Sequence, residues 1–497
     1  MEGKTTEPVS RNKVLSNLLW RFLERCGAQG VTFIVSLVLA RLLNPAIYGT
    51  IAIVLVFTSI LDVFVDSGLG NALIQKKDAD DLDFSSVFFF NVCMCVVLYA
   101  LIFLAAPLIA SFYKKPELIA LIRVMSLTVV VSGVKNIQHA YVSRNMLFKR
   151  FFYATLGGTI SAAVVGIYMA YAGYGVWAIV AQHLLNVVMD TVILWATVRW
   201  RPKRMFSWER LRGLLFYGWK LLVSELLETV YTRLRQLIIG KLYTDEDLAF
   251  YNRGEQIPQF LTNNINTATN SVLLPAMAAE QDRTERVRNM TMRAITLSTY
   301  VIMPVMAGLA VCAEPIVRII LTEKWVPCVP FLQVFCIAYA FLPFHIANLN
   351  AVKAMGRSDL FLKMEILKKI VDLIILAIAM WFGPFVMALS LLAADVISQV
   401  INSWPNAKLI GYSYLKQLRD MFPNIALTLA MCLIIYPVRL LPLKDWALLL
   451  IQVPLGILVY VVGSKLIHNE NYSYILSVLK RFTARGRSET AQGEEEE

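Results

Sequence analysis

The segment VFFFNVCMCVVLYALIFLAAPLIA, which runs from Val87 to Ala110, carries no charged residue. A bilayer supplies no water to backbone amides, so an apolar stretch of roughly 20 residues predicts a membrane-spanning α-helix. About fourteen such stretches, separated by short loops, fill the chain between Arg11 and His468. The sequence therefore predicts an all-α integral membrane protein with about 14 transmembrane helices.

The predicted helices cover residues 14–43, 47–74, 86–111, 117–142, 152–172, 175–198, 214–241, 248–275, 291–313, 328–352, 364–382, 385–407, 421–439 and 446–467. The most basic loop, RWRPKRMFSWERLR from Arg199 to Arg212, follows the sixth helix. We therefore expect a first lobe over residues 1–198, a cytoplasmic linker over 199–213 and a second lobe over 214–409. Two further helices over 410–468 and a polar tail over 469–497 complete the predicted organisation.

The composition agrees with a membrane protein. Hydrophobic residues make up 58% of the chain and charged residues 16%, against about 45 to 50% and about 25% in soluble proteins. The net charge of +12 comes from Lys and Arg that sit mainly in every second loop. Cytoplasmic loops are enriched in these residues, so the pattern places both termini in the cytoplasm. The positive charge indicates topology and contact with anionic lipid, and it argues against a nucleic-acid partner.

No short apolar core followed by a small-residue cleavage site opens the chain, so we expect the first helix itself to direct membrane insertion. The cysteines show no metal-ligand spacing, and most of them lie in apolar segments. We expect packed thiols, no metal and no cofactor.

Two segments about 200 residues apart share one layout. LARLLNPAIYG (Leu39–Gly49) and IGKLYTDEDLAFYN (Ile239–Asn252) each place a basic residue at the end of an outgoing helix and a Tyr at the start of the returning one. Six helices separate the copies, so both have the same orientation and the repeat is parallel.

A row of amides follows the predicted helix 248–275, at spacings of three and four residues: Asn252, Gln256, Gln259, Asn263, Asn266 and Asn270. At 3.6 residues per turn these side chains share one face. An unpaired amide facing lipid costs roughly 1 to 3 kcal/mol, so the row faces either a wet cavity or another polar helix. The length of the row favours the cavity over hydrogen bonding in a dry bundle.

Charged residues occupy the first and seventh predicted helices at membrane depth. Arg21, Glu24 and Arg25 lie on the first helix, and Glu225, Glu228, Arg233 and Arg235 lie on the seventh. Such groups cost about 2.5 kcal/mol or more to insert, so they mark a pathway or pair with one another. Both interpretations stay open from the sequence alone.

Asp62 and Asp66 lie one turn apart on the second predicted helix. Two carboxylates this close raise each other's proton affinity, which suits a proton or sodium relay. Pairing with a nearby Arg is the alternative.

No enzyme signature is present in the sequence. The four histidines are scattered, no phosphate-binding loop is found, and the longest predicted loop is about 15 residues. These features favour a protein that carries a substrate over one that transforms it.

Six segments together resemble a known family. They are LARLLNPAIYG, DSGLGNALIQKK (Asp66–Lys77), IIGKL with AFYNRGEQIP (Ala249–Pro258), VLLPAMAAEQD (Val272–Asp282), EKWVPCVPFLQVF (Glu323–Phe335) and NAVKAMGRSD (Asn350–Asp359). Over nearly the whole chain the sequence resembles the polysaccharide-exporter (Wzx-type flippase) branch of the multidrug/oligosaccharidyl-lipid/polysaccharide exporter superfamily. It is especially similar to colanic-acid-type and teichuronic-acid-type exporters.

The resemblance implies two pseudo-symmetric six-helix lobes around a central cavity, plus two extra C-terminal helices. It also implies an activity: moving undecaprenyl-pyrophosphate-linked oligosaccharide across the bacterial cytoplasmic membrane by alternating access, for lipopolysaccharide or exopolysaccharide synthesis. Arginines Arg21, Arg25, Arg233, Arg235 and Arg253 would then bind the pyrophosphate, and the amides of residues 252–270 the sugars. Glu24, Glu225 and Glu228, with the two aspartates, would neutralise arginines or bind a coupling H⁺ or Na⁺. Polysaccharide-assembly proteins are possible partners.

A cation-coupled exporter of drugs or metabolites from the same superfamily is the alternative function. A mostly aromatic and anionic cavity would favour it, and the row of amides argues against it.

Overall fold

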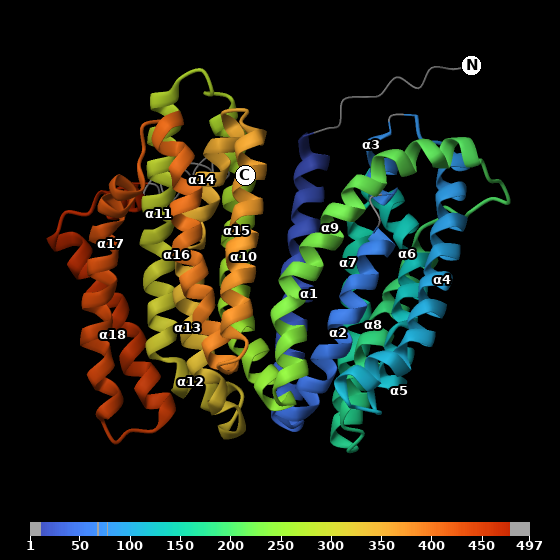
Figure 1. Cartoon of the computed structure of the whole chain (residues 1–497), viewed down its shortest axis with the longest axis horizontal. Helices are drawn as coiled ribbons and strands as arrows, with labels where there is room; N and C mark the ends of the chain where they lie inside the picture. The colour runs from blue at the N-terminus through green and yellow to red at the C-terminus, as the bar shows by residue number, and fades with distance from the viewer. Residues whose placement is uncertain (1–10, 67–68, 77, 478–497) are drawn as a thin grey trace, which may run out of the picture. The chain divides into compact units, whose positions relative to one another are not determined.

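The computed structural model describes residues 11–66, 69–76 and 78–477; for 11–19, 21–26, 217 and 263–271 it describes the backbone alone. Across these residues every regular element is a helix. They form two compact units that divide between Ala249 and Phe250. Each unit is a bundle of long helices (Figure 1).

The first unit contains α1 (Arg11–Leu42), α2 (Pro45–Asp66), α3 (Leu69–Gln75), α4 (Asp81–Tyr113), α5 (Leu118–Met125), α6 (Leu127–Arg144), α7 (Phe148–Tyr171), α8 (Val176–Thr197) and α9 (Trp208–Leu242). The helix α10 (Asp245–Ala278) begins in this unit and continues into the second. Within this unit α9 lies against α2, α3 and α4. The predicted start of a second lobe at residue 214 stays a prediction.

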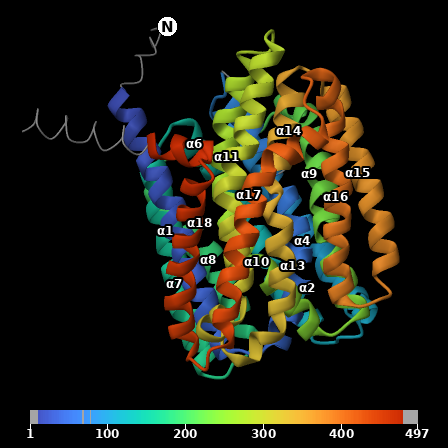
Figure 2. The same ribbon diagram turned by 90° about the vertical axis from the view of Figure 1, so that its left-hand side faces the viewer.

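The second unit continues with α11 (Thr284–Val311), α12 (Ala313–Ile320), the 3₁₀ helix η1 (Glu323–Cys328), α13 (Val329–Ala340), α14 (Leu342–Ala354), α15 (Ser358–Ala379), α16 (Pro384–Leu409), α17 (Tyr414–Ile435), the 3₁₀ helix η2 (Tyr436–Leu440) and α18 (Asp445–Leu466). Residues 470–477 form a further short helix. The helices α14, α15 and α16 pack on one another, and they lie side by side in Figure 2.

Ten helical segments in the described part of the chain are long and apolar enough to cross a membrane. The most apolar is Asp81–Tyr113, which contains the segment that opened the sequence analysis. Within that helix only a small part of the apolar window is buried inside the protein. Its remaining side chains are therefore available to face lipid.

Two of the predicted spans are broken in the structure. The predicted helix 117–142 divides at Ser126 into α5 and α6, and the predicted helix 328–352 divides at Phe341 into α13 and α14. Pro343 explains the second break, because it stands two residues into α14 and has no backbone N–H for a helix that would continue from α13. At the first break, Thr128 donates its hydroxyl to the Met125 carbonyl at 2.7 Å.

The core of the first unit lies where α3, α4, α6 and α7 meet the segment after α8. Trp200, Leu211 and Leu214 are buried against Phe84 and Phe151 in this cluster. The Trp200 ring lies 5.7 Å from Phe84. The predicted linker 199–213 is thus packed at both of its ends, and its last part, from Trp208, is already the first turn of α9.

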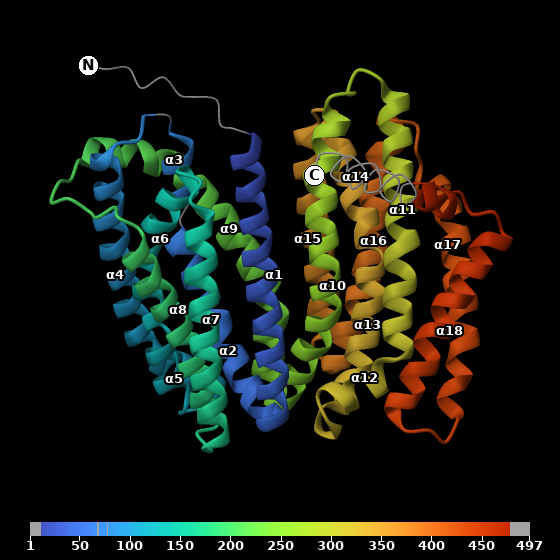
Figure 3. The same ribbon diagram turned by 180° about the vertical axis from the view of Figure 1, so that it is seen from behind.

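In the second unit, α17 and α18 pack against α11 and α12, which Figure 3 shows from behind. Tyr300 of α11 donates its hydroxyl to Ser464 at 2.8 Å, and Tyr460 donates to the Tyr300 carbonyl at 2.8 Å. Asn424 of α17 donates to the Thr296 carbonyl at 2.8 Å. Buried hydrogen bonds therefore attach the last two helices to the rest of their unit.

Candidate functional site

The predicted carboxylates of the second helix belong to a charged cluster inside the first unit. Asp62 and Asp66 on α2 act electrostatically on each other and on Lys135 of α6, and Glu225 of α9 acts on Asp66. Both aspartates and Glu225 are exposed on the surface of their unit. Three helices thus bring four ionisable groups together within the first unit.

Lys135 also forms an ion pair with Asp190 of α8, at 2.8 Å between Nζ and Oδ2. The next residue, Asn136, donates its amide to the Val65 carbonyl at 2.6 Å. The position of Lys135 is therefore fixed against both α2 and α8. The spacing of residues in the sequence could not predict this ion pair, because its two members lie 55 residues apart on different helices.

The charged residues of α9 differ in their exposure. Arg235 is buried, with 6% of its surface exposed, and it makes interactions within the protein. Arg233 is exposed and donates to Gln236 on its own helix at 3.4 Å. Glu228 is exposed too and has an interaction partner. Arg233 is thus the more available of the two arginines for a bound anion.

In the described part of α10, the guanidinium and the amides lie close together. Arg253 is buried, donates to the Gln256 oxygen at 2.6 Å and lies 5.1 Å from the centre of the Trp325 ring. Gln256 and Gln259 are exposed, and Asn252 is partly buried. The structure therefore holds Arg253 next to the first exposed amide of the predicted row.

Six predicted residues have side chains outside the part of the chain that the structure describes. They are Arg21, Glu24, Arg25, Asn263, Asn266 and Asn270. Their backbone is helical, in α1 and α10. Their predicted roles remain predictions.

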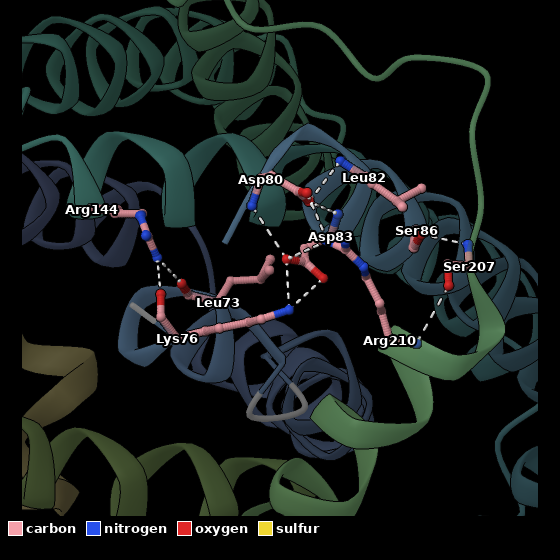
Figure 4. Close-up of polar contacts among 9 residues, drawn as sticks. All are labelled: Leu73, Lys76, Asp80, Leu82, Asp83, Ser86, Arg144, Ser207 and Arg210. Atoms are coloured by element: carbon pink, nitrogen blue, oxygen red, sulfur yellow. Dashed lines mark hydrogen bonds and ion pairs between the residues drawn. The ribbon is translucent and has the colours of Figure 1, made fainter. Parts of the chain in front are cut away.

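The DSGLGNALIQKK segment ends in a second polar cluster, at the turn between α3 and α4 (Figure 4). The Asp83 side chain is fully buried, and Lys76 donates to both of its oxygens at 2.7 Å. Asp80 caps α4 by accepting from the Asp83 backbone N–H at 3.0 Å. Arg210 of α9 donates to Asp80 at 2.7 Å. The cluster therefore ties the start of α9 to the start of α4.

The environment of Asp80 changes its acidity. Its hydrogen bond from the Asp83 backbone, and the bonds from Arg210, favour the ionised carboxylate. They hold the pKa of the Asp80 carboxyl below its ordinary value of 3.8, although partial burial opposes them.

The same end of α4 holds the basic segment that precedes α9. Ser85 accepts from the Lys203 backbone N–H at 3.0 Å, and Ser86 accepts from that of Ser207 at 2.9 Å. Trp200 donates its indole N–H to Asp81 at 3.1 Å. These bonds fix residues 200–207 to the first unit.

The opposite end of the first unit contains the repeated helix–turn–helix, which the structure confirms. α1 ends at Leu42 and α2 begins at Pro45; α9 ends at Leu242 and α10 begins at Asp245. Gly49 lies against the Asp245 backbone so closely that a Cβ would stand 1.8 Å from the carbonyl oxygen. Lys115 forms an ion pair with Asp245, which also accepts from Thr50 at 3.2 Å.

The first unit thus presents cations and carboxylates, and the described part of α10 in the second unit presents a guanidinium and amides. The described residues contain no group of three or more potential metal ligands. Guanidinium groups suit phosphate, and amides suit hydroxyls. Sequence analysis missed the Lys135–Asp190 pair and a second pair, His345–Asp395, whose Nε2 and Oδ1 atoms lie 2.8 Å apart.

The chain is similar to several known proteins. It is 22% identical to the succinoglycan biosynthesis transport protein ExoT of Rhizobium meliloti, over 84% of this chain and 83% of the relative. It is 23% identical to the lipopolysaccharide biosynthesis protein WzxC of Escherichia coli, over 86% and 87%. It is 26% identical to the teichuronic acid biosynthesis protein TuaB of Bacillus subtilis, over 61% and 63%.

Solved structures share the fold. The inward closed lipid II flippase MurJ matches with a TM-score of 0.72 at 15% identity, over 93% of this chain and 99% of that structure. An inward-facing multidrug resistance transporter of the MATE family, in the MOP superfamily, matches with a TM-score of 0.61 at 15% identity, over 76% and 94%. The family model described as "Polysaccharide biosynthesis protein" matches residues 38–330, which is more than half of the sequence. This chain therefore belongs to the polysaccharide biosynthesis protein family.

Proposed function

We propose that this protein moves an undecaprenyl-pyrophosphate-linked oligosaccharide from the inner to the outer leaflet of the bacterial cytoplasmic membrane, by alternating access. The translocated repeat units would supply the synthesis of a cell-surface polysaccharide. The observation that carries the proposal is the polar and charged surface of α9 and α10 in a membrane protein of the polysaccharide biosynthesis family.

The relatives support transport over catalysis. ExoT is named as a transport protein of succinoglycan biosynthesis, and MurJ is named as a lipid II flippase. A lipid-linked sugar precursor has a charged headgroup that cannot cross the apolar core unaided, because burying charge without partners is costly. A bundle with polar groups at membrane depth offers such a headgroup a route.

The candidate site suits the two parts of that headgroup. The arginines Arg21, Arg25, Arg233, Arg235 and Arg253 would receive the pyrophosphate, because guanidinium binds phosphate bidentately. Amides of α10 would receive the sugar hydroxyls. Arg233, Gln256 and Gln259 are exposed within their units, which supports their access to a ligand.

Fourteen crossings are part of the proposal. Besides the ten apolar segments, α1, α9, α10 and α15 have 32, 35, 34 and 22 residues and are long enough to span a bilayer. Their charged and polar residues explain why they are less apolar than the other ten. With fourteen crossings, two six-helix lobes and two extra helices, both termini lie in the cytoplasm, as the distribution of Lys and Arg predicts.

A coupling ion would power the cycle. Asp62 and Asp66 interact with Lys135, Glu225 interacts with Asp66, and all three carboxylates are exposed in their unit, which supports a role for them in binding H⁺ or Na⁺. Glu24 and Glu228 would take part in the same way. Polysaccharide-assembly proteins would receive the product at the outer leaflet.

Deletion of the gene tests the function. We expect lipid-linked oligosaccharide to accumulate on the inner leaflet while surface polysaccharide is lost, and re-expression of the wild-type gene should restore export. Re-expression of Arg233→Ala should restore membrane insertion without export. Unchanged polysaccharide and no accumulation in the deletion strain would contradict the proposal and favour a small-molecule exporter.

A further inference from the structure

A buried histidine and a partly buried aspartate form a pair in the second unit. His345 of α14 is 9% exposed, and its Nε2 lies 2.8 Å from Oδ1 of Asp395 on α16. Its other ring nitrogen, Nδ1, lies 2.8 Å from the Asn402 amide nitrogen. Both ring nitrogens therefore have protein partners, and the two partners come from one face of α16.

These partners suit an uncharged ring. With the Asn402 amide nitrogen facing Nδ1, that ring nitrogen accepts and Nε2–H donates to Asp395. The Asn402 side chain is fully buried, and its Oδ1 has no hydrogen-bond partner among the residues that the structure describes. Rotation of this amide would turn Oδ1 toward Nδ1, where it would accept a hydrogen bond from a protonated imidazole. The site can therefore satisfy the ring in both protonation states.

A proton would change the net charge of the pair. An uncharged ring beside an ionised Asp395 gives the pair one negative charge, and a protonated ring gives it none. Asp395 receives one further hydrogen bond, from Gln399 at 3.4 Å. The Asp395 side chain is 24% exposed, so this member of the pair is not sealed inside its unit.

The helices that pack against α14 and α16 carry other titratable groups. They are Glu285, Arg286, Arg288, Arg293 and Tyr300 of α11, Cys336 and Tyr339 of α13, Asp359, Lys363, Glu365, Lys368, Lys369 and Asp372 of α15, and Tyr414, Lys416, Arg419, Asp420 and Cys432 of α17. Lys353 lies on α14 itself and Lys408 on α16. Tyr414 reaches the pair through Gln399, to which it donates at 3.4 Å. Lys368 pairs with Glu365 at 2.7 Å, and Asp420 accepts from Tyr412 at 2.7 Å.

Buried amides continue the contact between α14 and α16 beyond the pair. Asn348 of α14 accepts from Gln417 of α17 at 3.0 Å and from Asn406 of α16 at 2.8 Å. All three amides are fully buried. His345 also lies in the first turn after the break at Phe341. Broken helices at membrane depth commonly carry the coupling-ion sites of transporters.

The first unit contains a pair of the same layout. Its broken span, α5 and α6, carries Lys135, which pairs with Asp190 of α8 at 2.8 Å. In the second unit the broken span, α13 and α14, carries His345, which pairs with Asp395 of α16. Lysine keeps its charge near neutral pH, whereas histidine gains and loses a proton there. Of the two pairs, the one in the second unit therefore contains the residue type that can bind and release a proton near neutral pH.

From these contacts we infer that His345 and Asp395 form a proton-binding site in the second unit, and that coupling of transport to a proton gradient requires this site in addition to the carboxylates proposed for the first unit. The inference rests on the proposed flippase function. A proton suits the site better than a metal cation, because hard cations take oxygen ligands, whereas His345 presents ring nitrogens. Proton uptake at Nδ1, with rotation of Asn402, would change the contact between α14 and α16.

The test uses the full-length purified protein in vesicles that hold the lipid-linked oligosaccharide recovered from the deletion strain. Its appearance at the outer surface is followed with an impermeant lectin, with and without a pH gradient. A gradient of about one pH unit can stimulate wild-type movement up to about tenfold. In His345→Gln, which keeps a donor and an acceptor but binds no proton, this stimulation should vanish while movement without a gradient persists.

Asp395→Asn should give the same result, and it replaces His345→Gln where that variant does not fold. His183→Gln on α8 is the matched control, because it removes an imidazole from the other unit and should keep the wild-type stimulation. Retained stimulation in both site variants, a response to a sodium gradient alone, or loss of all movement in both variants would each overturn the proton site. A wild-type protein that moves no lipid-linked oligosaccharide at all would instead refute the proposed function, and the coupling site with it.

Discussion

Asp83 is a single buried carboxylate that holds two turns of the first unit together. It accepts two hydrogen bonds from Lys76 and lies 3.5 Å from Arg210, and its side chain is fully buried. Asp83→Asn removes the charge that these cations face and leaves part of their hydrogen bonding unmet. We expect a loss of about 1 to 3 kcal/mol, seen as a lower midpoint of thermal unfolding in detergent. Asp78→Asn, in the exposed part of the same loop, is the control and should unfold like the wild type.

The lowered pKa of Asp80 predicts how the stability of the same cluster depends on pH. Because its pKa lies below the ordinary 3.8 in the folded protein, the ionised carboxylate stabilises the fold above that value. The stabilisation is lost as the pH falls through the folded pKa. Asparagine still caps a helix but does not ionise. The difference in unfolding midpoint between wild type and Asp80→Asn should therefore be present at neutral pH and shrink below about pH 4. A difference that stays constant down to the acid limit would contradict this account.

At the scale of the elements, Gly49 controls how closely α2 approaches the start of α10. A methyl group at this position would overlap the Asp245 carbonyl, which is backbone and cannot turn aside. Gly49→Ala should therefore push the two helices apart, weaken the Lys115–Asp245 ion pair and lower the unfolding midpoint. Gly30 on α1 has open space around its Cβ position, so Gly30→Ala is a matched control that should be neutral or slightly stabilising. Equal unfolding midpoints for the two variants would refute the packing argument.

The same elements show what the sequence can predict. The length of the apolar stretches predicted most of the helices correctly. The Asn44-Pro45 turn and the corresponding turn after α9, at Tyr243-Thr244, were also predicted, because turn signals are local in the sequence. The break at Phe341 was not predicted, although Pro343 was visible, because prolines also occur inside intact helices here, as at Pro258.

Pairs between helices could not be predicted either. Lys135 with Asp190 and His345 with Asp395 are joined by packing between distant helices, and no periodic pattern encodes which helices will meet. Part of the candidate ligand site, by contrast, followed from spacing alone. The three- and four-residue steps of α10 place Asn252, Gln256 and Gln259 on one face by helical geometry.

For the whole molecule, the decisive question is whether the polar helices α9 and α10 cross the membrane. Three positions separate the alternatives: Arg204 before α9, Glu246 at the turn between the helices, and Asp282 after α10. All three are exposed within their units. If both helices cross, Glu246 lies outside the cell and the other two lie in the cytoplasm. If neither crosses, all three lie on the cytoplasmic side.

Single cysteines at these positions, in a protein whose seven native cysteines are replaced, make the distinction measurable. We expect an impermeant maleimide to label Glu246→Cys in intact cells, and to label Arg204→Cys and Asp282→Cys only after permeabilisation. Ionisable residues such as Glu225, Glu228 and Arg235 would then lie within a crossing helix, where their cost is tolerated if they face protein, water or a charged ligand. Protection of all three positions in intact cells would place α9 and α10 outside the bilayer and remove the polar route on which the proposed function depends.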